Sequence, residues 1–162
     1  MSKTIPLSRG FTTEVSDADY ESLSRYNWSY DRNGYAVRQE RAGPKRRKKV
    51  LMHRAIMSPD PGFDVDHIDG NKLNNRRSNL RVATRSQNSA NRGPTGGTSK
   101  FKGVRYCKDK GRYRAEIQAD GRYIHLGYFD VEVDAARAYD QAAVTHYGEF
   151  AYTNVFQSPS GD

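Results

Sequence analysis

The sequence has 162 residues, 35% of them hydrophobic, and a formal net charge of +8 at pH 7. That length suits one ordinary domain or two small ones, and 18 aromatic residues exclude wholesale disorder. A single cysteine excludes an internal disulfide and a zinc site built from several cysteines, and no apolar run suits a membrane span or a signal peptide. We therefore expect an intracellular protein with no membrane partner.

The positive charge is confined to two adjoining blocks of the chain. Residues 1–40 carry a net charge of −1 and residues 129–162 a net charge of −5, whereas residues 41–98 carry +9 and residues 99–128 carry +5. Basic blocks of this kind suit a polyanion, because each phosphate that is neutralised releases condensed counterions. A merely solvated, soluble surface is the alternative.

Two local patterns define the N-terminal region. Residues 16–26 predict a short helix with Ser16 or Asp17 as its N-cap and acidic residues in its first turn. The pair Asn33-Gly34, which lies between two runs that bear aromatic residues, predicts a β-hairpin.

Five consecutive cations, Lys45 to Lys49, follow a Gly-Pro pair. We interpret them as a loop that contacts phosphates, because a segment that itself suits a polyanion follows immediately. An exposed hairpin tip is the alternative. The next residues, Val50 to Met57, have apolar side chains at helical spacing and predict a short helix.

The segment from Val65 to Asn88 is strongly polar and has few residues to bury. It places a carboxylate, Asp66, beside an imidazole, His67. A carboxylate is a hard ligand that suits Mg²⁺, and a neutral imidazole can take a proton from water near pH 7. Neighbouring residues of a regular strand point to opposite sides, so the pair shares a target only where the strand ends or is irregular.

Three elements are expected around this pair. Residues 84–87 fit a capping box, so a helix should begin at Thr84 and hold Asn88 in its opening turns. A strand end that bears Asp66 and His67, a second short strand over Leu80–Ala83 and this helix form a ββα unit. In such a unit Asp66 and Asn88 could meet across a metal ion.

The text VDHIDGNKLNNRRSNLR, followed by a helix that carries Asn, resembles the HNH nuclease motif of the ββα-metal superfamily. The resemblance implies that Asp66 and Asn88 bind one divalent metal ion and that His67 is the general base. It also implies that Asn79, the central asparagine, orients the histidine. The last motif position is Asn rather than His, which favours Mg²⁺, with Mn²⁺ as the alternative, over softer metals.

The chemistry implied by this resemblance is hydrolysis of a phosphodiester. His67 would deprotonate a water that attacks phosphorus, while the metal ion contacts a non-bridging oxygen and the departing 3′ oxygen. The ends would be 5′-phosphate and 3′-hydroxyl. Guanidinium groups suit the flanking phosphates, and the segment offers four of them: Arg76, Arg77, Arg81 and Arg85.

Structural roles are the alternative for each of these residues taken singly. Asp66 could cap a loop, Asn79 could form an ordinary Asx turn and Asn88 could be a solvated helix residue. Their joint order and spacing favour the nuclease site. His53 matches a histidine that recurs before the motif, and we interpret it as structural support for the site, with a direct catalytic role as the alternative.

The chain changes character after a Gly-, Ser-, Thr- and Asn-rich stretch at residues 89–99, which marks a linker. Residues 101–129 predict three short strands, with turns at residues 108–111 and 120–121. Residues 131–148 predict an amphipathic helix that is capped by Asp130, presents an alanine-rich face and ends at Gly148.

Alternation sorts the strand residues into an apolar face, which meets the alanines of the helix, and a polar face rich in arginine. A sheet of this shape can enter the major groove, where Arg reads guanine and Glu accepts from cytosine. KGVRY, YRAEI, HLGYFD and VEVDAARAYDQAA resemble the ethylene-response-factor (Apetala-type) DNA-binding domain of plants. Cys107 falls where that family often has Arg, so its sequence preference is not carried over. The residues expected to contact DNA are Lys102, Arg105, Arg112, Arg114, Glu116, Gln118 and His125.

The expected fold class is α+β, with a small N-terminal β-hairpin region, a ββα-metal HNH core, a linker, and a three-stranded antiparallel sheet packed on one helix. We expect a nuclease domain at residues 1–92 with its core motif at 50–92, and a linker at 93–98. The DNA-binding domain is expected at 99–156 and a tail at 157–162.

The sequence predicts a site-specific, metal-dependent DNA endonuclease of the homing or phage type, with double-stranded DNA as its partner and no small-molecule substrate. It would act as a monomer that nicks, or that cuts both strands in turn, in the cytoplasm of a bacterial or phage-infected cell. The alternative is a non-catalytic transcription regulator, which has no reason to carry Asp66, His67, Asn79 and Asn88 together. An RNA-binding protein fits the charge, but an A-form major groove is too narrow for the sheet.

Overall fold

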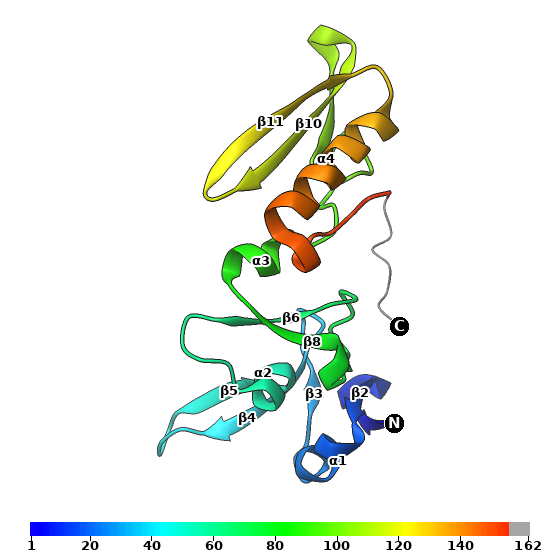
Figure 1. Ribbon diagram of the computed structural model, residues 1–162. Helices are drawn as coiled ribbons and strands as arrows, with labels where there is room; N and C mark the ends of the chain where they lie inside the picture. Colours follow the sequence, from blue (N-terminus) through cyan, green and yellow to red (C-terminus); the bar gives the residue numbers. More distant parts are fainter. Residues whose placement is uncertain (156–162) are drawn as a thin grey trace. The chain divides into compact units, whose positions relative to one another are not determined.

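The computed structural model describes residues 1–155 and divides the chain into two units, Met1–Thr84 and Arg85–Asp162. Helices and short strands alternate in both units, so the α+β class is confirmed (Figure 1). Within residues 1–155, no helix combines the length and the apolar character needed to cross a bilayer. The expected tail at 157–162 lies outside the described residues.

Three small sheets and two α-helices make up residues 1–84, all of which the structure describes. The sheets have the strand orders β1-β2-β7, β3-β4-β5 and β6-β8, and every pair is antiparallel except β2 with β7. The helices are α1 (Asp17–Ser24) and α2 (Met52–Met57). The strands are β1 Ser2–Pro6, β2 Thr12–Ser16, β3 Ser29–Tyr30, β4 Ala36–Arg41, β5 Arg47–Leu51, β6 Asp64–His67, β7 Asn74–Asn75 and β8 Leu80–Ala83.

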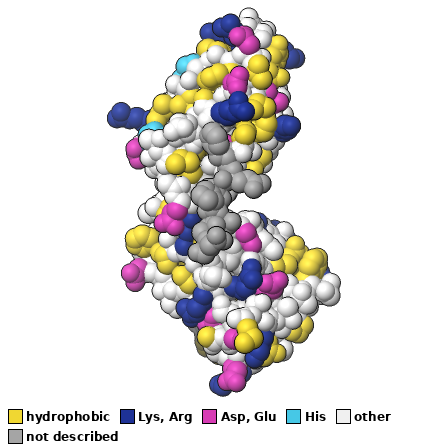
Figure 2. Space-filling model, turned by 45° about the vertical axis from the view of Figure 1, so that its right-hand side comes forward, with side chains coloured by type: hydrophobic (Ala, Val, Ile, Leu, Met, Phe, Trp, Pro, Cys, Tyr) yellow, Lys and Arg dark blue, Asp and Glu magenta, His cyan; other side chains and the backbone are white. Residues whose placement is uncertain are grey.

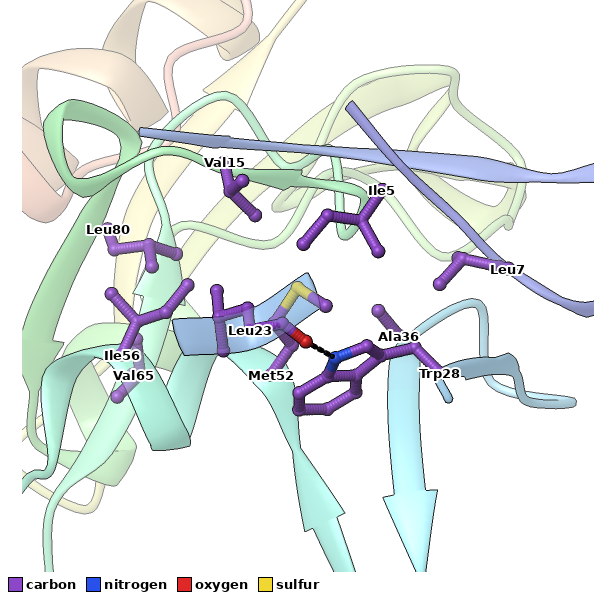
Figure 3. Packing of buried hydrophobic residues seen from close by; sticks show 10 residues of the cluster. All are labelled: Ile5, Leu7, Val15, Leu23, Trp28, Ala36, Met52, Ile56, Val65 and Leu80. Carbon is purple, nitrogen blue, oxygen red and sulfur yellow. Dashed lines mark hydrogen bonds between the residues drawn. The ribbon is translucent and has the colours of Figure 1, made fainter. Parts of the chain in front are cut away.

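The core of the first unit joins these elements around the strands that carry the polar motif (Figure 3). Trp28 donates its indole N–H to the carbonyl of Leu23 at 2.9 Å, which satisfies the one polar atom of the ring. The ten buried residues of this core are Ile5, Leu7, Val15, Leu23, Trp28, Ala36, Met52, Ile56, Val65 and Leu80.

Both patterns of the N-terminal region are confirmed. The helix is α1, with Ser16 in the N-cap position. The hairpin joins β3 to β4, and in its turn the Asp31 carboxylate accepts the backbone N–H groups of Asn33 and Tyr35 at 2.9 Å each. Gly34 has a φ of +86°, which glycine adopts without steric cost.

The basic string differs from the loop that we expected. Arg47, Lys48 and Lys49 lie in β5, which pairs with β4 along its whole length, and Val50 and Leu51 continue that strand. The helix predicted from Val50 therefore begins at Met52. Pairing with β4 decided the conformation, because a partner strand overrides weak local propensity.

The strands of the polar motif are where the sequence predicts them. β6 ends at His67 and β8 covers Leu80–Ala83, so that Asp66 lies opposite Arg81 across the ladder. Helix α3 (Arg85–Ala90) begins one residue after Thr84. The two units divide between Thr84 and Arg85, so α3 groups with the second unit, whereas the boundary expected from composition lay at 93–98.

The described part of the second unit contains the predicted sheet and helix. Strands β9 (Val104–Cys107), β10 (Arg112–Ala119) and β11 (Arg122–Phe129) are antiparallel in the order β11-β10-β9, and α4 (Glu132–Tyr147) packs on their apolar face (Figure 1). Gly148 ends the helix as predicted. The cap is different, because Val131 occupies the N-cap position while the Asp130 carboxylate accepts a hydrogen bond from Arg112 at 2.7 Å.

Close packing of sheet and helix depends on one glycine. A Cβ on Gly103 would lie 2.0 Å from the Tyr139 ring and 2.6 Å from the carbonyl oxygen of Glu116, and the φ of Gly103 is +72°. No other residue fits there. After α4, the buried Asp140 carboxylate accepts the backbone N–H groups of Asn154 and Val155, at 2.7 Å each, and so fixes the following segment to the helix.

Candidate active site and nucleic-acid interface

His67, at the end of β6, is buried with 6% of its surface exposed. Its Nε2 lies 3.2 Å from Oδ1 of Asn75. Burial lowers the pKa of His67, against the opposing effects of the Asn75 hydrogen bond and of the carboxylates of Asp69 and Asp66. The ring is therefore neutral near pH 7, which is the form that a general base needs.

Two aromatic side chains surround the His67 ring. The His53 ring lies edge-on to it with centroids 5.0 Å apart, and the Tyr35 ring is 5.1 Å from His53 and 6.2 Å from His67. Burial, together with the nearby His67 and Arg54, lowers the pKa of His53 to about 3. His53 thus contributes a neutral ring that packs against the candidate base.

Asp66 is buried and paired. Its Oδ2 accepts hydrogen bonds from Nε and Nη2 of Arg81, at 2.9 and 2.8 Å. The two side chains are 6% and 12% exposed. Arg81 thus binds the carboxylate that is expected to bind the metal ion, and the phosphate contact expected of Arg81 stays a prediction.

Asn79 shapes the loop after β6. Its Oδ1 accepts the backbone N–H of Asp69 at 3.1 Å, and its Nδ2 donates to Oδ1 of Asp69 at 2.8 Å and to the carbonyl of Asn74 at 2.9 Å. Burial alone would raise the pKa of Asp69, but hydrogen bonds from Asn74, Asn79 and the backbone of Asn71 outweigh it and lower that pKa. These contacts hold the loop, and the orienting role expected of Asn79 stays a prediction.

The amide that contacts the His67 ring belongs to Asn75, which sequence reasoning missed. Asn75 is fully buried in β7, the two-residue strand that pairs in parallel with β2. The pair of adjacent asparagines in DGNKLNN was the sequence signal for this contact. A second amide side chain directly after the loop suggests a residue that is buried and hydrogen-bonded within the protein. The contact itself depends on the pairing with β2, which local sequence does not reveal.

The remaining arginines of the motif have different surroundings. Arg77 forms a two-pronged pair with the buried Asp19 of α1, at 2.9 Å for Nε–Oδ2 and 2.7 Å for Nη2–Oδ1, and this hydrogen bonding raises the pKa of Arg77. Arg76 donates to Oδ1 of Asn74 at 2.8 Å. Arg85 is exposed on α3. Arg77 therefore ties the motif to α1, and the phosphate role expected of Arg76, Arg77 and Arg85 stays a prediction.

The donor atoms expected for the metal ion are of the oxygen type that a hard divalent ion prefers. Within residues 1–155, no group of three or more His, Cys, Asp or Glu side chains forms a metal site. The expected donors are fewer: the carboxylate of Asp66 and the amide of Asn88, which lies on α3. Mg²⁺ keeps several waters and often takes only one or two protein carboxylates together with phosphate oxygens, so this small oxygen donor set suits it. The role of Asn88 as a ligand stays a prediction.

The polar face of the second unit carries most of the residues that we expected to contact DNA. Arg105 and Arg114 are cross-strand partners, and Glu116 lies beside both, with Oε2 2.6 Å from Nη2 of Arg114 and Oε1 3.9 Å from Nε of Arg105. Arg112, Gln118 and His125 are exposed, as is Arg105. Guanidinium and carboxylate groups on an exposed sheet face suit the edges of bases in a major groove.

Lys102 is the exception among these residues. Its Nζ donates to the carbonyls of Ala90 and Ser89, at 2.6 and 3.3 Å, where α3 ends. Burial and the nearby Arg92 lower the pKa of Lys102 to about 8. Lys102 therefore caps α3 and fastens it to the sheet domain, and the DNA contact expected of Lys102 stays a prediction.

The space-filling view shows acidic, basic and apolar side chains interspersed over one side of the molecule (Figure 2). No single basic patch covers the described residues on that side.

Comparison with known proteins finds two family models that match separate segments of the chain. The HNH endonuclease family model matches residues 58–90, and the AP2 domain model matches residues 99–149. The uncharacterized HNH endonuclease L560 of Acanthamoeba polyphaga mimivirus is 34% identical over 153 residues, which cover 90% of this chain and 76% of that protein. The chain belongs to the HNH endonuclease family.

Two further relatives of this HNH protein match smaller shares of it. Protein 3.8 of Escherichia phage T7 is 34% identical over 107 residues, or 65% of this chain and 88% of that protein. APETALA2-like protein 2 of Oryza sativa subsp. indica is 53% identical over 60 residues, or 36% of this chain and 14% of the plant protein. Both resemblances expected from the sequence are confirmed, and the protein is a nuclease-family chain with a DNA-binding module.

Proposed function

We propose that this HNH protein is a site-specific, metal-dependent DNA endonuclease, in which the HNH segment hydrolyses the phosphodiester and the AP2 domain chooses the site. The buried, neutral His67 next to Asp66 carries the proposal. A neutral imidazole beside a carboxylate supplies a proton acceptor and a ligand for a hard divalent ion, neither of which a protein that only bound DNA needs.

The residues of the HNH motif have distinct parts in this reaction. His67 removes a proton from a water molecule that attacks phosphorus. Asp66 and Asn88 would hold the divalent ion, and Arg81 orients the Asp66 carboxylate through their contact. The ion, for which Mg²⁺ is the best fit, would supply positive charge to a non-bridging oxygen and to the departing 3′ oxygen. The products would be 5′-phosphate and 3′-hydroxyl ends.

The protein would act as a monomer of the homing or phage type, which nicks one strand or cuts both in turn. A single His67 per chain supports this, because one base serves one strand at a time. The AP2 sheet supports site selection, since its exposed Arg105 and Arg112 can reach base edges while the buried motif cannot.

The proposed function is tested by incubating the purified chain with supercoiled plasmid in Mg²⁺ and in EDTA. We expect relaxed or linear DNA only with the metal, and nicks that DNA ligase reseals, because ligase needs a 5′-phosphate beside a 3′-hydroxyl. Asn88→Ala should raise the Mg²⁺ concentration required for cleavage. DNA that is bound but never cut with Mg²⁺ or Mn²⁺ would favour the non-catalytic regulator instead.

A further inference from the structure

A chain of three buried side chains leads from β2 to the candidate base. The hydroxyl of Thr13 donates to the carbonyl of Leu73 at 2.7 Å, and Nδ2 of Asn75 donates to Oγ1 of Thr13 at 2.8 Å. Oδ1 of Asn75 lies 3.2 Å from Nε2 of His67. Thr13 is 1% exposed, Asn75 0% and His67 6%, so water does not compete readily for these atoms.

Counting hydrogens along this chain fixes the direction of each bond. Thr13 has one hydroxyl hydrogen, which lies on the Leu73 carbonyl, so its oxygen can only accept from Asn75. A flipped Asn75 amide would place its oxygen against Oγ1 of Thr13 and near the carbonyl of Lys72, which lies 3.4 Å from the present Nδ2. Buried acceptors that face each other without a hydrogen cost about 1–3 kcal/mol per unsatisfied group. The Asn75 oxygen therefore faces His67.

We propose that Thr13 and Asn75 are positioning residues that keep the proton of neutral His67 on Nε2 and the lone pair on Nδ1. An amide oxygen only accepts, so the nitrogen that faces it must be the donor. This inference rests on the proposed nuclease function, because it names the nitrogen that takes the proton from water. It also gives β2 a part in the site, although β2 lies outside the residues matched by the HNH model.

The backbone holds this arrangement in register. β2 and β7 pair in parallel, with Glu14 beside Asn74 and Val15 beside Asn75, and the backbone N–H of Glu14 donates to the carbonyl of Leu73 at 2.9 Å. The Leu73 carbonyl thus accepts two hydrogen bonds, from the backbone N–H of Glu14 and from the hydroxyl of Thr13. Thr13 cannot move away from Asn75 unless this strand pairing opens.

The test reads the tautomer directly by long-range ¹⁵N NMR of the full chain without metal or DNA. At about pH 8.5, where an imidazole with the ordinary pKa of about 6.5 is neutral, we expect wild-type His67 to show the Nε2–H form. The His67 signals are identified by their absence in His67→Ala. An Nδ1–H form in the wild type overturns the proposal, whatever the variants do.

Variants assign the effect to the chain of bonds. Thr13→Val keeps the shape but removes the hydroxyl, so His67 should become a mixture of tautomers, whereas Thr13→Ser should retain the wild-type form. Asn75→Asp, which can only accept, should also keep Nε2–H, and Asn75→Ala should not. A Thr13→Val protein with unchanged tautomer contradicts the role of Thr13.

Kinetics then separate positioning from folding. We expect Thr13→Val to lower kcat by about 100-fold with little change in KM, as small misplacements of a reacting group do, and Thr13→Ser to restore it. Because the NMR experiment needs no cleavage, a chain that cuts no DNA would refute the proposed function while leaving the tautomer result standing.

A separate observation concerns the tip of the β4–β5 hairpin. Its cations Arg41 and Lys45 to Lys48 are all exposed, and Arg41 lies directly opposite Arg47 in the strand ladder. Like charges in that position are destabilising. The other cations of the hairpin are engaged, since Lys49 pairs with Asp31, and Arg38 pairs with Glu40 and lies 3.8 Å from the Tyr26 ring centroid.

None of the five tip cations forms an ion pair within residues 1–155. We infer that this tip binds the phosphate backbone of double-stranded DNA, as a contact outside both the HNH and AP2 matches. The positive charge of the tip is complementary to that of DNA, and the β4–β5 hairpin exposes these cations to solvent. Their mutual repulsion destabilises the hairpin, and a bound polyanion would relieve it. Such contacts are independent of base sequence.

The inference is tested by measuring duplex DNA affinity in EDTA against salt concentration. Arg46→Ala/Arg47→Ala should reduce the slope of log K against log salt by about 2, because each phosphate contact contributes about 0.9. The reduction should be equal for duplexes of unrelated sequence. The matched control is Arg25→Ala/Arg137→Ala, which removes two exposed arginines from α1's end and α4. An unchanged slope, or an equal loss in the control, overturns the inference.

Discussion

The two units treat their polar side chains in opposite ways. In the first, Asp66, His67 and Asn75 are less than 7% exposed and are bonded to protein atoms. In the second, Arg105 and Arg112 are exposed on an open sheet. Pairing is obligatory for buried polar groups, and it fixes their geometry. Bond hydrolysis needs fixed atoms, whereas reading a groove is compatible with long, mobile side chains.

Two ion pairs of nearly equal length show this difference in burial between the units. Arg81 and Asp66 are 2.8 Å apart with side-chain exposures of 12% and 6%, and Arg112 and Asp130 are 2.7 Å apart with exposures of 52% and 75%. Removing one partner of a buried pair leaves an uncompensated charge, while an exposed charge is simply hydrated. The same distance should therefore have very different energetic consequences.

The largest effect is expected from Arg81→Met. It should lower the free energy of unfolding of the first unit by about 3–5 kcal/mol, because the buried Asp66 carboxylate loses its ion pair with Arg81. Urea unfolding followed by the fluorescence of Trp28, the single tryptophan and a core residue of this unit, measures it. The double variant Arg81→Met/Asp66→Asn should recover part of the loss. No recovery would mean that packing, not charge, explains the effect.

The next effect is a pH dependence that belongs to the first unit. His53 has an ordinary pKa near 6.5 when unfolded and a pKa of about 3 when folded, so the unfolded state binds more protons between these values. Stability is then complete above about pH 6.5 and falls as the pH is lowered. From pH 7 to pH 4 the expected loss due to His53 is on the order of 3 kcal/mol.

This pH effect is measured as the difference between wild type and His53→Gln, both followed by Trp28 fluorescence. The variant should lose less stability than the wild type on acidification, whatever its stability at neutral pH. His146→Gln, which changes an exposed histidine of α4, is the control. Parallel curves for wild type and His53→Gln would show that His53 is not the group that titrates.

A smaller effect is expected on the recognition side. Arg105→Ala should weaken binding to the preferred site by ~1–3 kcal/mol while leaving binding to unrelated DNA nearly unchanged. Competition binding in EDTA, with preferred and unrelated duplexes, gives the two affinities. An equal loss on both duplexes would assign Arg105 to phosphate contact and remove it from site selection.

The smallest effect should come from Arg112→Ala. Because its partner Asp130 is exposed, the loss of this ion pair should change the free energy of unfolding by less than about 1 kcal/mol. Amide hydrogen exchange of β10 and α4 reports on the second unit, which has no tryptophan. A loss as large as that for Arg81→Met would contradict the distinction drawn between the two units.

The contrast between the two units also explains which structural features the local sequence could predict. In the second unit, alternation and helical spacing placed Ala115, Ile117 and Tyr139 in the core and left Arg105 on the polar face, all of which is confirmed. Nearest neighbours in the chain decide these positions, because hairpins and a following helix are local. The contact of the Lys102 Nζ with the end of α3 was not foreseen there, and the DNA contact expected of Lys102 stays a prediction.

In the first unit, motif spacing located β6, β8 and the start of α3, but not the contacts of the site. Asn75 reaches His67 because β7 pairs with β2, and Thr13 is 62 residues from Asn75 in the chain. The Arg81–Asp66 pair follows from the β6–β8 register, which a one-residue slip would destroy. Long-range pairing of this kind leaves no local pattern.

The central claim is that His67 of the first unit removes the proton from the attacking water. It is tested by the single-turnover cleavage rate of His67→Ala in Mg²⁺ at protein concentrations that bind all the DNA, with His146→Ala as the matched control. We expect a rate about 10²–10⁴ times lower for His67→Ala, an unchanged fraction of bound DNA, and wild-type cleavage by the control. Cleavage by His67→Ala at the wild-type rate, with the DNA equally occupied, would contradict the claim.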